Sequence, residues 1–214
     1  MSLSQTNTPQ EFRVIETLGW SAQTGAQRLD RHLTRMAGTC AALGIPFPKE
    51  QLLFLINDVS SDHDLRIRLT VDRDGQGALE QWPLAKTADH WTVAIADQRV
   101  DSADLWLGHK TTMRALYDTA RGNLPAGIDE WIFLNERGEV CEGTITNVFV
   151  QKGDRLLTPP LTSGLLPGVL RADLLDSGRA VEAVLTLPDL ERAEAIFCGN
   201  ALRGLIKSTL IRAE

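Results

Sequence analysis

FLNERGEVCEGTITNVFV, residues 133–150, places two apolar stretches on either side of a turn. The turn is Asn135-Glu136-Arg137-Gly138, since Asn and Gly favour the backbone conformations that tight turns need. We expect strands over Glu130–Leu134 and Val140–Val150, because both stretches are rich in β-branched and aromatic residues. The region is therefore predicted to form a hairpin in a β-rich second half of the chain.

Glu142 is the candidate carboxylate of this hairpin. The two-residue period of a strand puts one set of side chains on the same face: Val140, Glu142, Thr144 and Thr146. Such a mostly polar face is expected of a strand that looks into a ligand cleft. It is equally expected of a strand face that is simply in contact with solvent.

Lys110, within GHKTT at residues 108–112, is the candidate amine. We expect a helix that Thr111 or Thr112 caps and that runs to about Arg121. Only a neutral amine attacks a carbonyl group, so a reactive Lys110 needs a lowered pKa. Without that, Lys110 is a solvated residue near the start of the helix.

GLLPGVLR, residues 164–171, is a turn bounded by glycines that leads into a helix predicted over Val169–Asp176. Free N–H groups at the start of a helix bind phosphate. A similar turn, Cys198-Gly199-Asn200-Ala201, precedes a final helix expected over Ala201–Leu210. Asn200 is placed either to cap that helix or to contact an anion.

The remaining elements follow from periodicity and from Gly and Pro signals. We expect no ordered element in residues 1–10 and a loop over Thr17–Gly25. The first half is predicted to contain a strand at Phe12–Ile15, a helix from Gln27 that stops at Gly44, a short helix from Pro48, and strands at Leu65–Val71, Gly77–Trp82 and Trp91–Ala96. The second half is predicted to add strands at Leu156–Thr158, Ala180–Leu185 and Ala195–Cys198 and a short helix at Pro188–Ala193.

Strands and helices are mixed without a regular strand–helix–strand alternation, so the expected fold class is α+β. We expect two lobes, a smaller N-terminal α/β lobe over residues 1–104 and a larger C-terminal lobe over residues 105–214.

Composition narrows the class of protein. The 214 residues include 43% hydrophobic residues, which is ordinary for a globular chain with a sizeable core. The net charge of −6 argues against a nucleic-acid-binding surface and favours a small-molecule ligand. Three scattered cysteines without a CxxC pair give no metal site and fit a reducing compartment. With no signal core and no apolar span, we expect a cytoplasmic protein and no membrane partner.

Four stretches, in this order, resemble the class IV pyridoxal-phosphate enzymes, which include branched-chain and D-amino-acid aminotransferases and 4-amino-4-deoxychorismate lyases. The stretches are HKTT from His109, FLNERGEVCEGTITNVFV from Phe133, TPPL…GLLPGVLR from Thr158 and GNALRGL from Gly199. The likeness runs from about Glu16 to Leu210 and is closest to lyase-type domains fused behind aminodeoxychorismate synthase component I. It implies a two-lobed fold type IV architecture whose N-terminal lobe is reduced relative to full-length members.

The resemblance also implies roles for individual residues. Lys110 occupies the position of the lysine that bonds the aldehyde of pyridoxal 5'-phosphate, and Glu142 that of the carboxylate facing the pyridine nitrogen. The implied phosphate contacts are Arg35, the backbone amides of Val169 and Leu170, and Asn200. Tyr117 and Asn147 are implied to support the cofactor.

The substrate-binding residues are less defined. Arg66, Arg68 and Arg114 are candidate partners for substrate carboxylates, and each is otherwise a plain surface charge. A homodimer and a functional link to aminodeoxychorismate synthase are expected from the resemblance.

Three functions are compared. The first is a lyase that converts 4-amino-4-deoxychorismate to 4-aminobenzoate and pyruvate in folate biosynthesis. The alternative is a class IV aminotransferase acting on branched-chain or D-amino acids. The third is a non-catalytic relative that serves as a binding or assembly partner, against which Lys110 and Glu142 argue.

Overall fold

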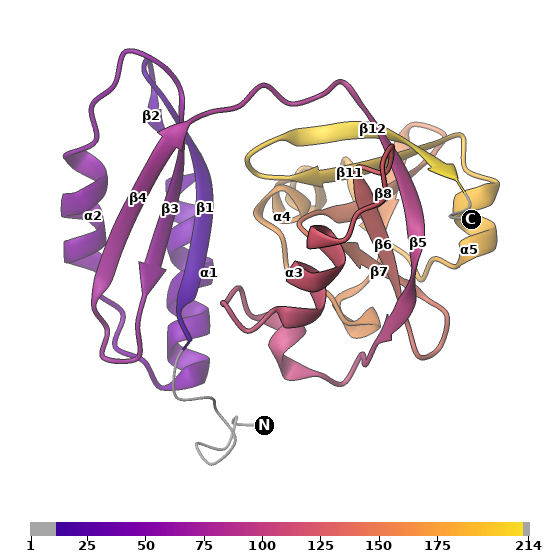
Figure 1. Ribbon diagram of the computed structural model, residues 1–214, viewed down its shortest axis with the longest axis horizontal. Coiled ribbons are helices and arrows are strands. Elements are labelled where there is room, and N and C mark those ends of the chain that lie inside the picture. Colours follow the sequence, from indigo (N-terminus) through magenta and orange to yellow (C-terminus); the bar gives the residue numbers. More distant parts are fainter. Residues whose placement is uncertain (1–11, 212–214) are drawn as a thin grey trace. The chain divides into compact units, whose positions relative to one another are not determined.

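The computed structural model describes residues 12–211, so residues 1–10, where no ordered element is expected, lie outside the described range. The chain divides into two compact units, which are described separately (Figure 1). The units are Met1–Lys86 with His109–Met113, and Thr87–Gly108 with Arg114–Glu214.

This division differs from the expected boundary between residues 104 and 105. Strand β5 (His90–Val100) pairs in parallel with two strands of the second unit, so it belongs there and not to the first lobe. Residues 109–113, in contrast, pair with the first unit. Long-range strand pairing sets both assignments, and local sequence pattern does not encode it.

The first unit is an antiparallel sheet in the order β2-β1-β3-β4, with two helices packed on one face. Its elements are β1 (Val14–Ser21), β2 (Gly25–Ala26), α1 (Leu29–Leu43), α2 (Lys49–Asn57), β3 (Leu65–Val71) and β4 (Gly77–Pro83). Helix α1 ends as predicted at Gly44, whose φ of 68° is a left-handed conformation that favours glycine. Helix α2 begins after Pro48, also as predicted.

A buried ion cluster joins β1 to α1. The fully buried Glu16 carboxylate accepts hydrogen bonds from Arg35 Nε at 2.7 Å and Arg35 Nη2 at 2.6 Å, and His32 Nδ1 lies 2.7 Å from Glu16 Oε2. Burial by itself would raise the pKa of Glu16, but the Arg35 guanidinium and His32 lower it to about 2. The ionised carboxylate therefore ties the helix to the sheet.

The second unit is built on a closed ring of strands. The sheet order is β10-β9-β8-β11-β12-β5-β6-β7, and β7 pairs back with β8 to close the ring. After β5, its strands are β6 (Glu130–Asn135), β7 (Val140–Gly143), β8 (Asn147–Lys152), β9 (Arg155–Thr158), β10 (Ala180–Glu182), β11 (Ala195–Asn200) and β12 (Gly204–Ile211). Its helical segments are η2 (Leu105–Gly108), α3 (Ala115–Gly122), η3 (Leu161–Ser163), α4 (Val169–Asp176) and α5 (Leu187–Glu191).

Alternate residues along these strands pack on different sides, as the two-residue period requires. One set forms the main core with α5: Val93, Ile132, Leu134, Val148, Val150, Ile196, Ile206 and Leu190 are members. The opposite set packs against helices, with Phe133 beside Tyr117 of α3, and Phe149 beside Leu170 and Leu174 of α4. The sheet thus holds α3 and α4 in fixed places.

The end of the chain corrects the prediction. Residues 204–211 form strand β12, and the helix expected over Ala201–Leu210 is absent from the described chain. Buried Ile206 and Ser208 alternate with exposed Lys207 and Thr209, which is the two-residue period of a strand. In so short an apolar stretch, this period cannot be told from that of a helix by sequence alone. Pairing with β11 and β5 on both sides then satisfies the backbone.

Other boundaries also differ from the predictions. Strand β1 continues to Ser21 through the expected loop, because its residues from Thr17 onward pair with β3. Helix α3 begins at Ala115 after Arg114, and neither Thr111 nor Thr112 caps it. Those two threonines instead pair with the start of β1.

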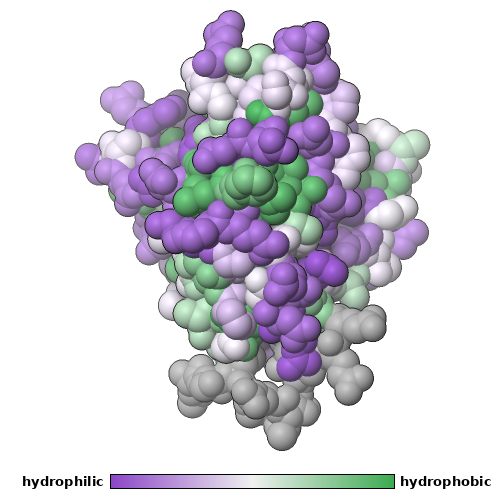
Figure 2. Space-filling view, turned by 90° about the vertical axis from the view of Figure 1, so that its left-hand side faces the viewer, coloured by the Kyte–Doolittle hydropathy of each residue, from purple (hydrophilic) through white to green (hydrophobic). Residues whose placement is uncertain are grey.

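The outer side of α2 carries an exposed apolar side chain. Phe54 is 72% exposed, and Figure 2 shows an apolar patch bordered by hydrophilic residues on this side of the first unit. Across residues 12–211, no helix has the length and apolar character needed to cross a bilayer.

We expect Glu16→Gln to lower the free energy of unfolding by about 3 kcal/mol, because it removes the buried carboxylate with which the largely buried Arg35 charge is paired. The stabilisation of the folded state by the Glu16 carboxylate is fully present above its ordinary pKa of 4.5. It is lost as the pH falls toward 2. Denaturant unfolding at several pH values measures both effects.

Asp62→Asn is the control, since Asp62 pairs with His63 on the exposed surface and its loss should not measurably change stability. Equal unfolding midpoints for Glu16→Gln and the unmodified chain at neutral pH would contradict the structural role of Glu16.

Candidate functional site

Lys110 lies in the first unit, on an extended segment beside β1. The Ile15 N–H donates to Lys110 O at 2.9 Å, and the Thr112 N–H donates to Arg13 O at 2.9 Å. The hydroxyl of Thr112 also accepts a hydrogen bond from the Arg13 N–H at 2.9 Å. The backbone of the candidate amine is therefore fixed to a sheet, and its side chain is half-buried.

Arg35 has a protein partner in this structure, since its guanidinium binds both oxygens of Glu16. Its expected contact with a phosphate stays a prediction. Arg28, just before α1, has a φ of 53° and is the one non-glycine residue with a positive φ in the described chain. Strained conformations of this kind cluster at functional sites, so Arg28 joins the candidate anion-binding residues.

The two arginines of β3 lie on its partly exposed face. The guanidinium of Arg66 lies over the ring of Trp82, 4.4 Å from its centroid, which is a cation–π contact. Arg68 is half-buried, with Thr17 and Glu80 as its neighbours in register. Both remain candidates for substrate carboxylates.

Glu142, in β7, is the buried candidate carboxylate of the second unit and is 7% exposed. Its Oε1 accepts a hydrogen bond from the Tyr117 hydroxyl at 2.9 Å, and its Oε2 accepts one from the Leu166 N–H at 3.1 Å. Burial and the Glu142 charge both raise the pKa of Tyr117, so the phenol stays protonated as a donor. The Tyr117 ring packs edge-on against Phe133, with centroids 5.1 Å apart.

The segment after Leu166 leads directly into α4. Asn147 Nδ2 donates to Leu166 O at 3.0 Å, and a Cβ on Gly168 would overlap with Asn147 Oδ1. The Ala172 N–H bonds Gly168 O, closing the first turn of the helix. The earlier N–H groups, those of Val169 and Leu170, have no acceptor within the helix, as at any helix start.

Asn200 ends β11 and stabilises the turn before β12. Its Oδ1 accepts hydrogen bonds from the N–H groups of Leu202 at 3.0 Å and Arg203 at 2.9 Å. Its Nδ2 donates to Ile145 O at 3.1 Å. The expected helix cap is thus a turn cap, and the predicted phosphate contact of Asn200 stays a prediction.

Sequence reasoning missed Glu130, which is fully buried and organises the turn between β7 and β8. Its carboxylate accepts hydrogen bonds from the backbone N–H groups of Thr144 at 3.0 Å and Ile145 at 3.2 Å, and from the Thr146 hydroxyl at 3.2 Å. The expected continuous strand over Val140–Val150 is wrong for this reason. The polar face predicted for that strand does not exist either, because these threonines bind Glu130.

Arg114, a predicted substrate partner, also contacts this turn. Its Nε donates to Asp118 at 2.7 Å, and its Nη2 donates to Thr144 O at 2.8 Å. Its role toward a substrate stays a prediction. No local pattern pointed to the contact with Thr144, because Thr144 lies 30 residues further along the chain.

The second unit brings several of its predicted residues together. Glu142 is linked through Leu166 to the start of α4, and a Cβ on Gly199, beside Asn200, would lie 3.0 Å from Leu170 Cδ2. A buried carboxylate suits a protonated ring nitrogen, and helix N–H groups behind a glycine suit a phosphate. These residues therefore fit pyridoxal phosphate.

Comparisons with known proteins agree with this chemistry. The family model described as amino-transferase class IV matches residues 13–211. A Schizosaccharomyces pombe protein provisionally named aminodeoxychorismate lyase is 28% identical over 193 residues, 86% of this chain and 84% of that protein. A Methanocaldococcus jannaschii protein provisionally named branched-chain-amino-acid aminotransferase is 38% identical over 198 residues, 79% of this chain and 68% of that protein.

A solved structure from Mesorhizobium loti, provisionally named an amino-acid aminotransferase, superimposes with a TM-score of 0.90. It is 42% identical in sequence, and the match covers 94% of this chain and 100% of that one. The fold type expected from the four sequence stretches is thereby confirmed.

We expect Gly168→Ala to lower the free energy of unfolding by about 1–3 kcal/mol, because the added methyl group would displace the buried Asn147 side chain. Denaturant unfolding followed by circular dichroism measures the change.

Gly122→Ala, at the end of α3, is the matched control, since a Cβ there meets no atom within 4 Å. That variant should be as stable as the unmodified chain or slightly more stable. Similar stability of the two variants would show that the turn before α4 tolerates a side chain.

Proposed function

The chain belongs to the class IV aminotransferases, a family that uses pyridoxal phosphate, and we propose that it is a lyase of this family. In this proposal it converts 4-amino-4-deoxychorismate to 4-aminobenzoate and pyruvate. The buried Glu142 carboxylate, held by Tyr117 and Leu166 close to the start of α4, is the observation that carries the cofactor assignment. Similarity to the S. pombe protein over most of both chains supports the lyase assignment.

When bound, pyridoxal phosphate withdraws electrons from the substrate carbon that carries the nitrogen. Glu142 would hold a proton on the ring nitrogen, because a buried carboxylate stabilises a neighbouring positive charge. The N–H groups of Val169 and Leu170 would donate to the phosphate, with Asn200 as a further contact.

Lys110 would hold the cofactor through its side-chain amine. Its neutral amine would then take the proton from the substrate carbon that carries the nitrogen. For the lyase, the ammonium formed at Lys110 would donate that proton to the departing enolpyruvyl group, which leaves as pyruvate while the ring becomes aromatic. Each of these steps needs Lys110 at the same position.

A second candidate function is a class IV aminotransferase acting on branched-chain or D-amino acids. The 42% identity with the M. loti structure and the 38% identity with the M. jannaschii protein favour it. In this reaction Lys110 would take the same proton from the substrate carbon and no pyruvate would be released, so both functions use the same residues. A homodimer, a cytoplasmic location and a link to aminodeoxychorismate synthase are further parts of the proposal that the resemblance implies.

The decisive assay gives the cofactor-loaded protein freshly prepared 4-amino-4-deoxychorismate and measures pyruvate and 4-aminobenzoate together. We expect equal amounts of both products, and Lys110→Ala should lower the rate at least about 100-fold, because it removes the general base. Lys207→Ala, an exposed lysine of β12, is the matched control and should retain full activity.

Absence of both products, with keto acid formed from an amino-acid donor, would replace the lyase by the aminotransferase. Absence of both reactions, together with no visible absorption change on adding pyridoxal phosphate, would favour the non-catalytic relative.

The roles of Arg28 and Arg35 in phosphate binding and in stability can be distinguished by experiment. If Arg28 is the phosphate partner, Arg28→Gln should weaken pyridoxal phosphate binding about tenfold, the effect of losing one charged contact, without a large loss of stability. Arg35→Gln should mainly lower stability, because it leaves the buried Glu16 carboxylate with His32 alone. Fluorescence titration with the cofactor, beside denaturant unfolding, measures the two effects, and the opposite pattern would assign the phosphate contact to Arg35.

A further inference from the structure

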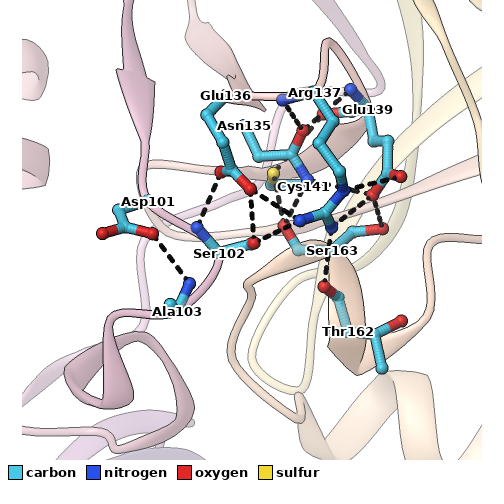
Figure 3. Close-up of polar contacts among 10 residues, drawn as sticks. All are labelled: Asp101, Ser102, Ala103, Asn135, Glu136, Arg137, Glu139, Cys141, Thr162 and Ser163. Atoms are coloured by element: carbon cyan, nitrogen blue, oxygen red, sulfur yellow. Dashed lines mark hydrogen bonds and ion pairs between the residues drawn. The ribbon is translucent and has the colours of Figure 1, made fainter.

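Arg137, in the turn between β6 and β7, is the centre of a polar network that the proposed chemistry does not use (Figure 3). Its Nε and Nη2 donate to the two oxygens of Glu139 at 3.0 and 2.8 Å, a two-point contact that fixes both side chains. Its Nη2 also donates to Thr162 O at 2.9 Å, and its Nη1 donates to the Ser102 hydroxyl. One side chain therefore joins three segments that are distant in sequence.

Glu139 extends this network to Ser163. The Ser163 hydroxyl donates to Glu139 Oε2 at 2.8 Å. The carbonyl of Ser163 accepts hydrogen bonds from Asn135 Nδ2 at 3.0 Å and from the Cys141 thiol at 3.1 Å (Figure 3). Hydrogen bonds from Arg137, and also from Asn135 and Ser163, lower the pKa of Glu139 to about 2, so Glu139 is ionised at neutral pH. Ser163 itself is fully buried, and this network fixes both its backbone and its side chain.

The chain runs only three residues from Ser163 to Leu166. Gly164 between them has a φ of 87°, and a Cβ there would lie 2.7 Å from Ser102 Cα, so this step is closely packed. Leu165 is 2% exposed. The next N–H, that of Leu166, donates to Glu142 Oε2 at 3.1 Å. Fixing Ser163 and Gly164 therefore leaves the Leu166 N–H little freedom to move.

We propose that Arg137 is a positioning residue that, through Glu139 and the backbone of Thr162 and Ser163, holds the Leu166 N–H against the Glu142 carboxylate. Its effect on the cofactor rests on the proposed function, but its effect on Leu166 does not. If the network only stabilised the turn, losing Arg137 would change stability and leave the Leu166 N–H undisturbed.

Amide hydrogen exchange on the full chain without added cofactor tests the link to Leu166. Arg137→Gln should speed exchange of the Leu166 amide about tenfold, because the segment that carries this N–H loses a charge-assisted anchor. Amides in α5 should exchange as in the unmodified chain. Arg137→Lys keeps the charge but not the two-point contact, so it should give an intermediate rate.

Arg192→Gln is the matched control, because Arg192 belongs to the same unit, is 75% exposed and pairs with Asp189 at 3.6 Å. It should leave exchange at Leu166 unchanged. Since the Arg137 side chain is 45% exposed, Arg137→Gln should fold. Should it fail to fold, Ser163→Ala removes only the hydroxyl contact with Glu139 and should speed the same exchange.

A second readout is the affinity for pyridoxal phosphate and the pH titration of its visible absorption. Arg137→Gln should weaken binding about tenfold, the usual scale for losing a residue that orients a ligand-binding side chain, and should shift the titration. Unchanged Leu166 exchange in both Arg137→Gln and Ser163→Ala would overturn the inference. Faster exchange in a chain that binds no pyridoxal phosphate, even unmodified, would support the inference and refute the proposed function instead.

Discussion

The hydrogen bond from the Leu166 N–H to the buried Glu142 carboxylate is the contact on which the candidate site of the second unit depends. It joins strand β7 to the segment that leads into α4, so the carboxylate and the helix N-terminus cannot move independently. Tyr117 supplies a second donor and fixes the other oxygen of Glu142. A buried carboxylate is costly unless such donors satisfy it, so the site is specified by polar contacts as well as by shape.

Two buried glutamates of this unit have different roles because their surroundings differ. Glu130 is enclosed by donors from the turn after β7, which suits a purely structural carboxylate. That turn places Asn147 at the start of β8, where it contacts Leu166 O beside Gly168. Glu142 instead takes its donors from α3 and from the segment before α4. The first carboxylate shapes the hairpin, and the hairpin then supports the site around the second.

Local signals in the sequence predicted the parts of the fold that local physics decides. Gly44 ends α1 because a glycine readily adopts a left-handed conformation, and Pro48 starts α2 because its fixed φ suits a helix start. The sequence predicts a helix where strand β12 lies, because a short apolar run has no clear period until its neighbouring strands are known. The assignment of β5 to the second unit depended on the same missing information.

The candidate site was predicted as a set of residues and not as a set of contacts. Lys110, Glu142 and the turn into α4 were found through motifs, whereas the partners of Glu142 lie 24 and 25 residues away along the chain. Glu130 gave no signal of its role, because its partners come from a separate segment. Arg137 gave none either, because its contacts with Ser102 and Thr162 join segments distant in sequence. Spacing identifies residues that share an element, but it does not identify side chains that meet across a fold.

The most direct test of this account is the ¹⁵N NMR shift of the ring nitrogen in ¹⁵N-labelled pyridoxal phosphate bound to the chain. We predict a protonated nitrogen at neutral pH in the unmodified chain and an unprotonated one in Glu142→Gln, because the buried carboxylate holds the proton. An unprotonated nitrogen in the unmodified chain, or a shift that Glu142→Gln leaves unchanged, would contradict the role assigned to Glu142.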